Sequence, residues 1–421
     1  MKRINHLRML IFALATGLTM CMLTACSSDG FNPGEGGGVQ PEPEAFHPID
    51  ASTRTLLDIV EKNEYTPTEF GETIGCWPML SVGGDALARL LKSTIKTVTY
   101  SRLPKMDALF KERVGTAADG SRQWNIKRRV FTYQSVSNAT GNDTTLVGSV
   151  IFPTNTVGKP HQVDVLTLYH HQAYLEESWL ASKSVTVMAM HALHNFAVIE
   201  PDGHGASDDL NKLVYETVNG DLSCLQMVDC VLAALEVMRQ ENVTLADDGY
   251  TNNWGTSLGT TAATALAQYM ENDATPDLQA LLNLRATYIG EGPTKFSQLQ
   301  DCKQYEADLP VQKYFEGWNP RLPFYMSSCK DDELVVYDEL KSYFMKLRTM
   351  PDGSINNNVQ WYDFYLPSIV KRITTIEEVS EATWGIGNHM LSAVVTLMAV
   401  SMVKDPADME KVLISNNIFD E

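Results

Sequence analysis

From about residue 160 onward, short apolar segments alternate with longer segments that have helical periodicity. This alternation is typical of a mostly parallel β-sheet with helices on both faces. The chain has to return along one face of the sheet between two parallel strands, and it usually does so as a helix. Six segments have the length and composition of buried strands, and they lie at 163–169, 196–200, up to Trp254, 284–289, 322–327 and 359–365. We therefore predict an α/β fold built on such a sheet.

Upstream of this alternation the pattern differs. Segments 130–133 and 146–152 have strand composition, and the turn-rich segment 138–143 between them predicts a hairpin. Residues 47–120 are predicted to form a mainly helical N-terminal segment.

One helix is well marked between the second and third of the six strands. Ser223 and Gln226 have the spacing of a capping box, which predicts that the helix begins there. Four apolar residues then recur at helical spacing, and we expect this stripe to lie in the core: Leu225, Val228, Leu232 and Leu235.

The first 25 residues have the composition of a secretory signal. Three basic residues come first, and residues 9–23 are almost continuously apolar. The segment ends in Leu23-Thr24-Ala25-Cys26, which resembles a bacterial lipobox. We expect cleavage after residue 25 and lipidation of Cys26, with an uncleaved anchor or a soluble export signal as the alternatives.

Residues 26–46 are then interpreted as the lipidated cysteine and a flexible tether. The tether is rich in Gly, Pro and acidic residues and has almost no apolar side chains. We expect a lipid-anchored protein of the bacterial cell envelope, at the outer membrane, facing either the periplasm or the cell surface.

The charge of the chain argues against two kinds of partner. The formal charge is −19, and removing Lys2, Arg3 and Arg8 with the signal leaves 30 of the 33 basic residues against 52 acidic ones, or −22. Nucleic acid and anionic lipid headgroups are therefore poor partners.

The cysteines give no metal-binding pattern. Of seven cysteines, Cys21 lies in the signal and Cys26 at its end, and the remaining five permit at most two disulfides. Cys224 and Cys230 lie on one predicted helix, where we expect them to be small buried apolar residues.

The motif that carries chemistry is Gly255-Thr256-Ser257-Leu258-Gly259. In a G-x-S-x-G motif a tight turn joins a strand to a helix, and the serine hydroxyl is exposed at the edge of the sheet. Residues 260–267 are nearly all Thr and Ala, which predicts a closely packed helix whose N-terminus favours developing negative charge. The alternative is a serine in an ordinary glycine turn, because the motif alone is short.

With this motif the sequence resembles the α/β-hydrolase superfamily, and in particular secreted bacterial lipases and esterases, from about residue 133 to 401. The resemblance implies an α/β-hydrolase domain at 121–405, followed by a C-terminal tail at 406–421. Residues of about 290–321 lie between two predicted strands of the sheet, so we predict that they form a cap over the site. The cap contains aromatic residues that would either bind an acyl or aryl group or pack the cap onto the sheet: Phe296, Tyr305, Tyr314, Phe315 and Trp318.

In this superfamily the triad occurs in the order serine, acid, histidine. Asp332 begins a D-x-x-V pattern after a predicted strand and is the preferred acid, with Asp331 as its competitor. His389 precedes an apolar segment and is the only histidine after the acid. The resemblance thus implies a triad of Ser257, Asp332 and His389.

The resemblance also implies an oxyanion hole made of two backbone N–H groups. One belongs to Leu258, and the other follows an early strand, where Gln172 is the preferred donor. The family usually has His-Gly at this point, whereas this chain has His171-Gln172. A second departure is that residues 249–254, before the nucleophile, are less apolar than a usual buried strand.

The segment 198–207 resembles the family's strand and the turn that borders the rim of the active site, so Asp202 and His204 are interpreted as structural residues.

We therefore expect a serine hydrolase that cleaves a small-molecule or glycan-linked carboxylic ester through an acyl-enzyme intermediate. The alternatives are a serine peptidase of related fold and a non-catalytic, surface-anchored binding lipoprotein.

The pairs His170-His171 and His191/His194 lack further ligands at the spacing of a metal site, so no metal is expected. The sequence contains no phosphate-binding or dinucleotide-binding loop, so no cofactor is expected.

Overall fold

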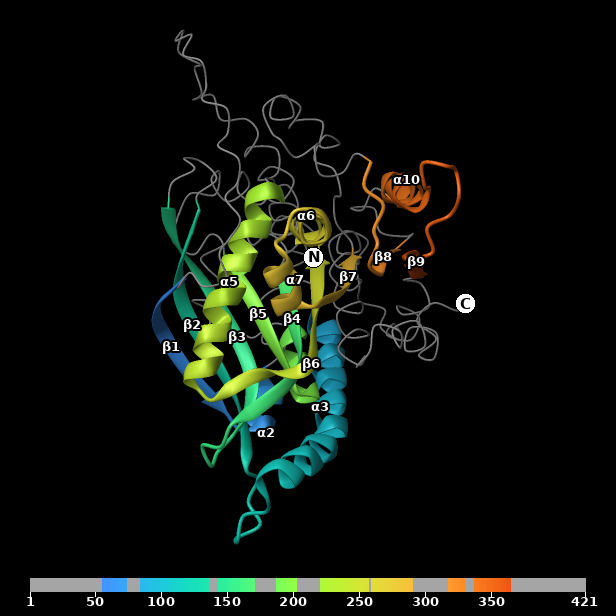
Figure 1. The fold of residues 1–421 in the computed structure, drawn as a ribbon. Coiled ribbons are helices and arrows are strands. Elements are labelled where there is room, and N and C mark those ends of the chain that lie inside the picture. The colour runs from blue at the N-terminus through green and yellow to red at the C-terminus, as the bar shows by residue number, and fades with distance from the viewer. Residues whose placement is uncertain are drawn as a thin grey trace, which may run out of the picture.

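The computed structural model describes residues 55–73, 84–136, 143–170, 187–202, 220–256, 259–290, 317–329 and 337–364. Within these residues a single sheet of nine strands has the order β1-β2-β3-β5-β4-β6-β7-β8-β9 (Figure 1). The strands are β1 (Leu56–Tyr65), β2 (Trp124–Val136), β3 (Asp143–Asn155), β4 (His161–His170), β5 (Phe196–Asp202), β6 (Val243–Thr256), β7 (Leu284–Gly290), β8 (Phe324–Cys329) and β9 (Val359–Phe364).

The sheet is antiparallel at one end and parallel over the rest. Strands β1, β2, β3 and β5 pair in antiparallel fashion, whereas β5, β4, β6, β7, β8 and β9 are parallel to one another. The six strands expected from the sequence are confirmed as β4 to β9, and the predicted hairpin is confirmed as β2 and β3.

The N-terminal segment differs from the sequence prediction in one element. Its described residues form two helices, α2 (Pro67–Thr73) and α3 (Gly84–Val114), but the prediction of helix is wrong for Leu56–Tyr65, which forms the edge strand β1. Register shifts in the pairing with β2 occur at Leu57 and Val60, and both side chains are exposed. These bulges break the alternation of apolar and polar residues by which a strand is recognised in a sequence.

Two helices pack on one face of the sheet, α5 (Gly220–Gln240) and α6 (Gly259–Asn272) (Figure 1). Helix α5 begins three residues before Ser223, so the predicted capping box at its start is wrong. The expected apolar stripe is confirmed, because Leu225, Val228 and Leu232 are buried in the main core and Leu235 packs against it.

The packing of α5 on the sheet depends on a glycine. A Cβ atom added to Gly148 of β3 would lie 2.6 Å from Sγ of Cys230 on α5. Cys224 and Cys230 are both buried and form no disulfide, as expected, and burial raises the pKa of the Cys230 thiol well above its ordinary value.

The opposite face of the sheet carries the short 3-10 helix η2 (Val187–His194), which also contacts α3. Further along the chain, α7 (Pro276–Leu282) is capped by Thr275, and α10 (Tyr337–Arg348) packs against β8 and β9. A second apolar cluster lies there, including Trp318, Phe324 and Phe344.

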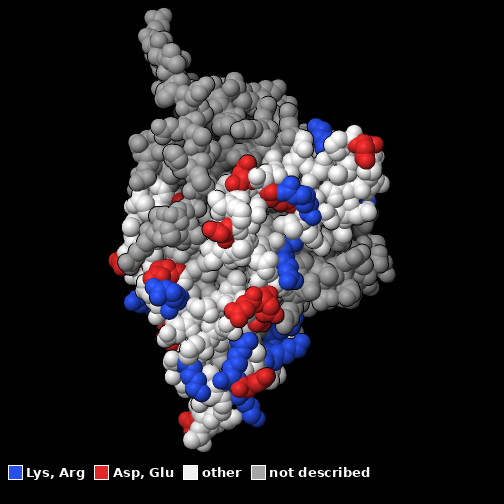
Figure 2. Space-filling model, viewed as in Figure 1, with Lys and Arg blue, Asp and Glu red and all other residues white. Residues whose placement is uncertain are grey.

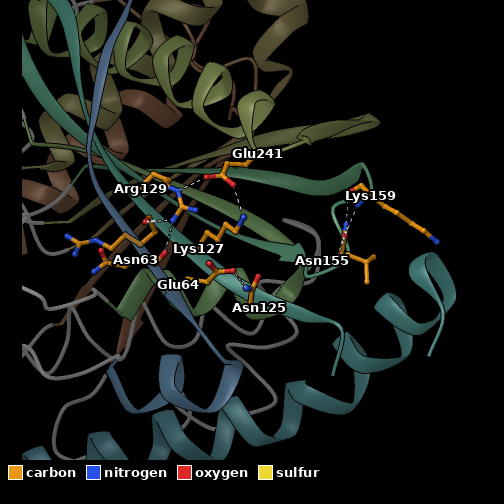
Figure 3. A network of polar contacts seen from close by, with 10 residues as sticks. Asn63, Glu64, Asn125, Lys127, Arg129, Asn155, Lys159 and Glu241 are labelled. Carbon is orange, nitrogen blue, oxygen red and sulfur yellow. Dashed lines mark hydrogen bonds and ion pairs between the residues drawn. The ribbon is translucent and has the colours of Figure 1, made fainter. Parts of the chain in front are cut away.

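An ionic network fixes β1 and β2 to the end of α5 (Figure 3). Glu241, just after α5, lies 2.7 Å from both Arg129 Nε and Lys127 Nζ, and Arg129 also donates to the Asn63 carbonyl on β1 at 2.8 Å. Burial opposes ionisation of Glu241, but the hydrogen bonds from the two cations outweigh it and lower the pKa of the carboxyl. The network joins three segments that are far apart in the sequence.

Candidate active site

The junction between β6 and α6 has the context that a nucleophile turn requires. Strand β6 ends at Thr256 and helix α6 begins at Gly259, so only Ser257 and Leu258 separate them. These two residues lie outside the described residues, but both elements that flank them are described. A strand, a two-residue turn and a helix are the arrangement in which a G-x-S-x-G serine is held at the top of a sheet.

The first glycine of the motif shows how tightly this junction is packed. A Cβ atom placed on Gly255 would lie 2.4 Å from the Gly259 carbonyl oxygen and 2.6 Å from Cβ of Ala263. Real Cβ atoms do not approach other atoms so closely, so the junction requires glycine at this position. The close approach of backbone to backbone that the motif predicts is therefore confirmed.

Helix α6 is packed as the sequence predicted. Its residues from Gly259 to Met270 are all buried, including the run of Thr and Ala that follows the motif. Its N-terminus lies directly after the predicted nucleophile, where helix dipole and free backbone N–H groups favour negative charge.

The topology brings the strand ends that precede three of the predicted residues to the same edge of the sheet. Parallel strands β4, β6 and β8 end at His170, Thr256 and Cys329. In the sequence, Gln172 comes two residues after the end of β4, Ser257 one residue after the end of β6, and Asp332 three residues after the end of β8. Strands β5 and β6 lie on opposite sides of β4, so the order of the strands reverses at this point. Ligands of open α/β sheets bind at the carboxyl edge beside such a reversal.

The predicted site residues themselves lie outside the described residues. This holds for Ser257, Leu258, Gln172, Asp332 and His389, for the competing Asp331, for His204, and for the lipidation site Cys26. The described structure therefore places the elements that lead to these residues, and their roles belong to the proposal below. Asp202 is described as the last residue of β5.

The polar composition of β6 is explained by its hydrogen bonds. Thr251 and Asn253 are fully buried, yet β6 pairs with β4 in regular register from Tyr250 to Gly255, which lies opposite His170. The Thr251 hydroxyl donates to the Leu282 carbonyl, and the Asn253 amide donates to the Ala263 carbonyl at 2.7 Å. Buried polar groups are tolerated when they are paired in this way.

His191 and His194 lie on η2, and their surroundings are those of packed side chains. Nδ1 of His191 lies 2.9 Å from the Thr167 hydroxyl, and the ring also packs edge-on against Trp254. Burial, with the nearby charge of Arg102, lowers the pKa of His194 well below its ordinary value, which favours the neutral ring. Within the described part of the chain, no group of three His, Cys, Asp or Glu side chains is arranged to hold a metal ion.

One aromatic residue of the predicted cap is described. Trp318 is buried, lies edge-on to Phe324 with ring centroids 5.5 Å apart, and donates its Nε1 proton to Glu271 at 3.1 Å. This residue packs the chain onto the sheet. The other four aromatic residues of the cap lie outside the described residues.

The described surface is mixed in charge. On the face shown in Figure 2, acidic and basic side chains of the described residues are interspersed. Among the helices that the structure describes, none is long and apolar enough to cross a membrane.

Comparison with known proteins supports the fold through structure alone. No family model matches the chain, and no curated protein matches it in sequence. The ligand-bound rice cell wall degrading esterase LipA from Xanthomonas oryzae matches with a TM-score of 0.50 and 13% identity, over 81% of this chain and 96% of that one. A Legionella pneumophila protein provisionally described as a hydrolase matches with a TM-score of 0.50 and 11% identity, over 84% and 100%. The chain has the α/β-hydrolase fold.

Proposed function

We propose that this protein is a serine hydrolase that cleaves carboxylic esters through an acyl-enzyme intermediate, with Ser257 as nucleophile. The observation that carries the proposal is the glycine-packed junction between β6 and α6, in which Gly255 lies against Gly259 and leaves two residues for the turn. An ordinary glycine turn needs no such contact. A nucleophile turn does, because the serine has to project from a sharp bend between strand and helix.

The remaining roles follow from the resemblance to the superfamily and from the order of the residues in the sequence. His389 takes the proton from Ser257 as the hydroxyl attacks the ester carbonyl, and Asp332 orients the imidazole and stabilises its charged form. Backbone N–H groups of Leu258 and Gln172 donate to the oxyanion of the tetrahedral intermediate. His389 then protonates the leaving alcohol, and a water molecule, activated by the same histidine, releases the acyl group.

The choice of ester as the substrate class rests on the resemblance and on one structural neighbour. The Xanthomonas oryzae protein is an esterase that degrades rice cell walls. That activity makes a small-molecule or glycan-linked ester a reasonable substrate class for a chain of the same fold. Because one fold serves many reactions, the test has to include other acyl substrates.

The proposed location follows from the start of the chain. The apolar segment that ends in Ala25 and Cys26 supports a location of the mature protein at the bacterial cell envelope, attached by lipid to the outer membrane. The tether that follows, rich in Gly and Pro, would let the hydrolase domain reach substrates away from the membrane surface. Metabolic labelling with a fatty-acid analogue, compared between the parent and Cys26→Ala, tests this assignment.

The function is tested by hydrolysis of chromogenic esters with acyl chains of increasing length, beside a matched set of peptide anilides. We expect turnover of esters by the parent protein and none by Ser257→Ala. Replacement of the triad acid lowers kcat by about 10⁴-fold, so Asp332→Asn should show that loss while Asp331→Asn stays close to the parent.

Each other outcome changes the proposal. Turnover of anilides in preference to esters would indicate a peptidase of related fold. Undiminished ester turnover by Ser257→Ala would exclude Ser257 as nucleophile. A folded parent that hydrolyses neither set would favour the binding lipoprotein.

A further inference from the structure

Three buried polar side chains on adjacent strands form a continuous hydrogen-bonded network next to the β6–α6 junction. His170 ends β4, Asn253 lies on β6 and Thr287 on β7, and each is at least 95% buried. Nε2 of His170 lies 3.0 Å from Oδ1 of Asn253. Nδ2 of Asn253 donates to the Ala263 carbonyl of α6 at 2.7 Å and to the Thr287 hydroxyl at 3.2 Å.

The network determines which imidazole nitrogen carries a proton. A backbone carbonyl can only accept a hydrogen bond, so the Ala263 carbonyl requires the nitrogen of the Asn253 amide on its side. The amide oxygen then faces His170 and accepts from Nε2. His170 is therefore fixed in a form protonated at Nε2, and its ring is held in one orientation.

A second contact joins the same two strands on the opposite face of the sheet. Tyr169 precedes His170, and successive side chains of a strand point to opposite faces. The Tyr169 hydroxyl interacts with the side chain of Thr256, the residue just before the predicted nucleophile. Both side chains are buried. The last two residues of β4 are thus fixed to the end of β6 on both faces.

We infer that His170 and Asn253 are positioning residues, which hold the carboxyl end of β4 in fixed register with the β6–α6 junction. The inference rests on the proposed function for its catalytic consequence: Gln172 follows β4 by two residues, and Ser257 follows β6 by one. The network then sets the distance between the oxyanion donor that follows β4 and the nucleophile. Burying three polar side chains in a parallel sheet is unfavourable unless they are hydrogen-bonded to one another. Apolar residues at these three positions would make the fold as stable, so stability alone does not explain the polar side chains.

The kinetic test compares His170→Leu with His170→Gln in the full mature chain. A misplacement of about 1 Å in an active site lowers the rate by about 100-fold, so we expect His170→Leu to lower kcat by about 10- to 100-fold with KM changed by less than about threefold. Glutamine keeps an N–H donor near the position of Nε2, so His170→Gln should recover most of kcat.

A matched control separates positioning from a general loss of stability. Thr264 lies on α6, is fully buried, and donates only within its own helix, to the Thr260 carbonyl at 2.8 Å. Thr264→Val removes this buried hydrogen bond and leaves the hydrogen bonds of His170 and Asn253 in place, so we expect it to lower the melting temperature while kcat stays within about twofold of the parent. Equal losses of kcat in His170→Leu, His170→Gln and Thr264→Val would overturn the inference.

A readout that needs no activity tests the network itself. Hydrogen exchange followed by mass spectrometry should show faster exchange in Asn253→Leu than in Thr264→Val, confined to the end of β4 and the first turns of α6. Equal exchange in these two variants would overturn the inference even if the parent hydrolyses no ester. Conversely, an inactive parent with the expected exchange pattern would contradict the proposed function and leave the network established.

Discussion

The Gly255 backbone lies so close to Gly259 that an added Cβ atom would be 2.4 Å from its carbonyl oxygen. This contact joins the last residues of a central strand to the first residue of a buried helix. The contact holds the end of β6 against the start of α6, and only Ser257 and Leu258 separate these two elements in the chain.

Replacing Gly255 with alanine tests this contact. We expect Gly255→Ala to lower the free energy of unfolding by about 3 kcal/mol or more and to abolish ester hydrolysis, because the Cβ meets backbone that has no room to move. Chemical denaturation and the ester assay measure the two effects.

A matched glycine serves as the control for Gly255. Gly158 has a positive φ of 72°, and a Cβ there meets nothing within 4 Å, so Gly158→Ala should lose only about 1 to 2 kcal/mol, from backbone strain alone, and remain active. If the two variants lose the same stability and keep the same activity, the junction is not as tight as described.

Gly148 and Cys230 should be coupled in stability. The Cβ of Gly148→Ala would lie 2.6 Å from the Cys230 sulfur, so we expect this variant to lose about 1 to 3 kcal/mol by overpacking. Cys230→Ala removes the sulfur and creates space at the same point. The double variant should therefore be more stable than the sum of the two losses predicts, by about 1 kcal/mol. Urea denaturation of the four proteins measures this coupling, and strict additivity would contradict the packing described.

Glu271 fixes the chain that enters β8. Its carboxylate is 4% exposed and accepts hydrogen bonds from Nε1 of Trp318 and from the backbone N–H groups of Arg321 and Leu322, at 2.8 to 3.1 Å. Hydrogen bonds to a charged acceptor contribute about 1.5 to 3 kcal/mol each, although they are not independent. We expect Glu271→Gln to lower the free energy of unfolding by about 2 kcal/mol.

The control for Glu271 is a carboxylate on a helix surface. Glu236, whose side chain is 24% exposed, pairs at 2.8 Å with Arg239, whose side chain is 68% exposed. Ion pairs that are open to solvent on one side contribute at most about 1 kcal/mol, so Glu236→Gln should change stability by less than about 1 kcal/mol. A similar effect of the two substitutions would show that the Glu271 carboxylate does not hold the segment.

Stability should fall between neutral and mildly acidic pH because of His161. Burial, together with the positive charge of Arg113, lowers the pKa of His161 from 6.5 to about 4, although a hydrogen bond to Asn195 opposes the shift. The unfolded chain therefore binds this proton more readily than the folded protein does. The resulting loss begins near pH 6.5, is complete below about pH 4, and amounts to about 3 kcal/mol.

The contribution of His161 can be isolated from other acid-sensitive groups by comparing pH dependences. We expect the drop in unfolding free energy from pH 7 to pH 4.5 to be smaller in His161→Phe than in the parent, by about 2 kcal/mol. The absolute stability of the variant is immaterial to this comparison, because only the difference between the two pH values is used. Equal drops would show that His161 is protonated as readily in the folded protein as in the unfolded chain.

Part of this architecture can be predicted from the sequence for a physical reason. Strands buried on both faces consist of nearly continuous apolar residues, so most of the parallel sheet is visible in the chain. The exceptions are strands whose pattern is altered locally. Bulges at Leu57 and Val60 conceal β1, and the hydrogen-bonded Thr251 and Asn253 make β6 more polar than its burial implies.

The candidate active site, like the sheet, can be predicted in part from the sequence. The motif from Gly255 to Gly259 is continuous in the sequence, so a tight junction could be expected before its packing was known. The contact between His170 and Asn253 joins residues 83 positions apart, and no local pattern marks it. Sequence order alone also does not distinguish Asp331 from Asp332, because the two residues are adjacent.

The most direct test of the central claim is covalent labelling of the mature chain with a fluorophosphonate probe, followed by peptide mass spectrometry. We expect one adduct, on Ser257, which is absent from Ser257→Ala and strongly reduced in His389→Ala because the serine is no longer activated. An adduct on another serine, or an unlabelled parent that is shown to be folded, would contradict the assignment of Ser257 as an activated nucleophile.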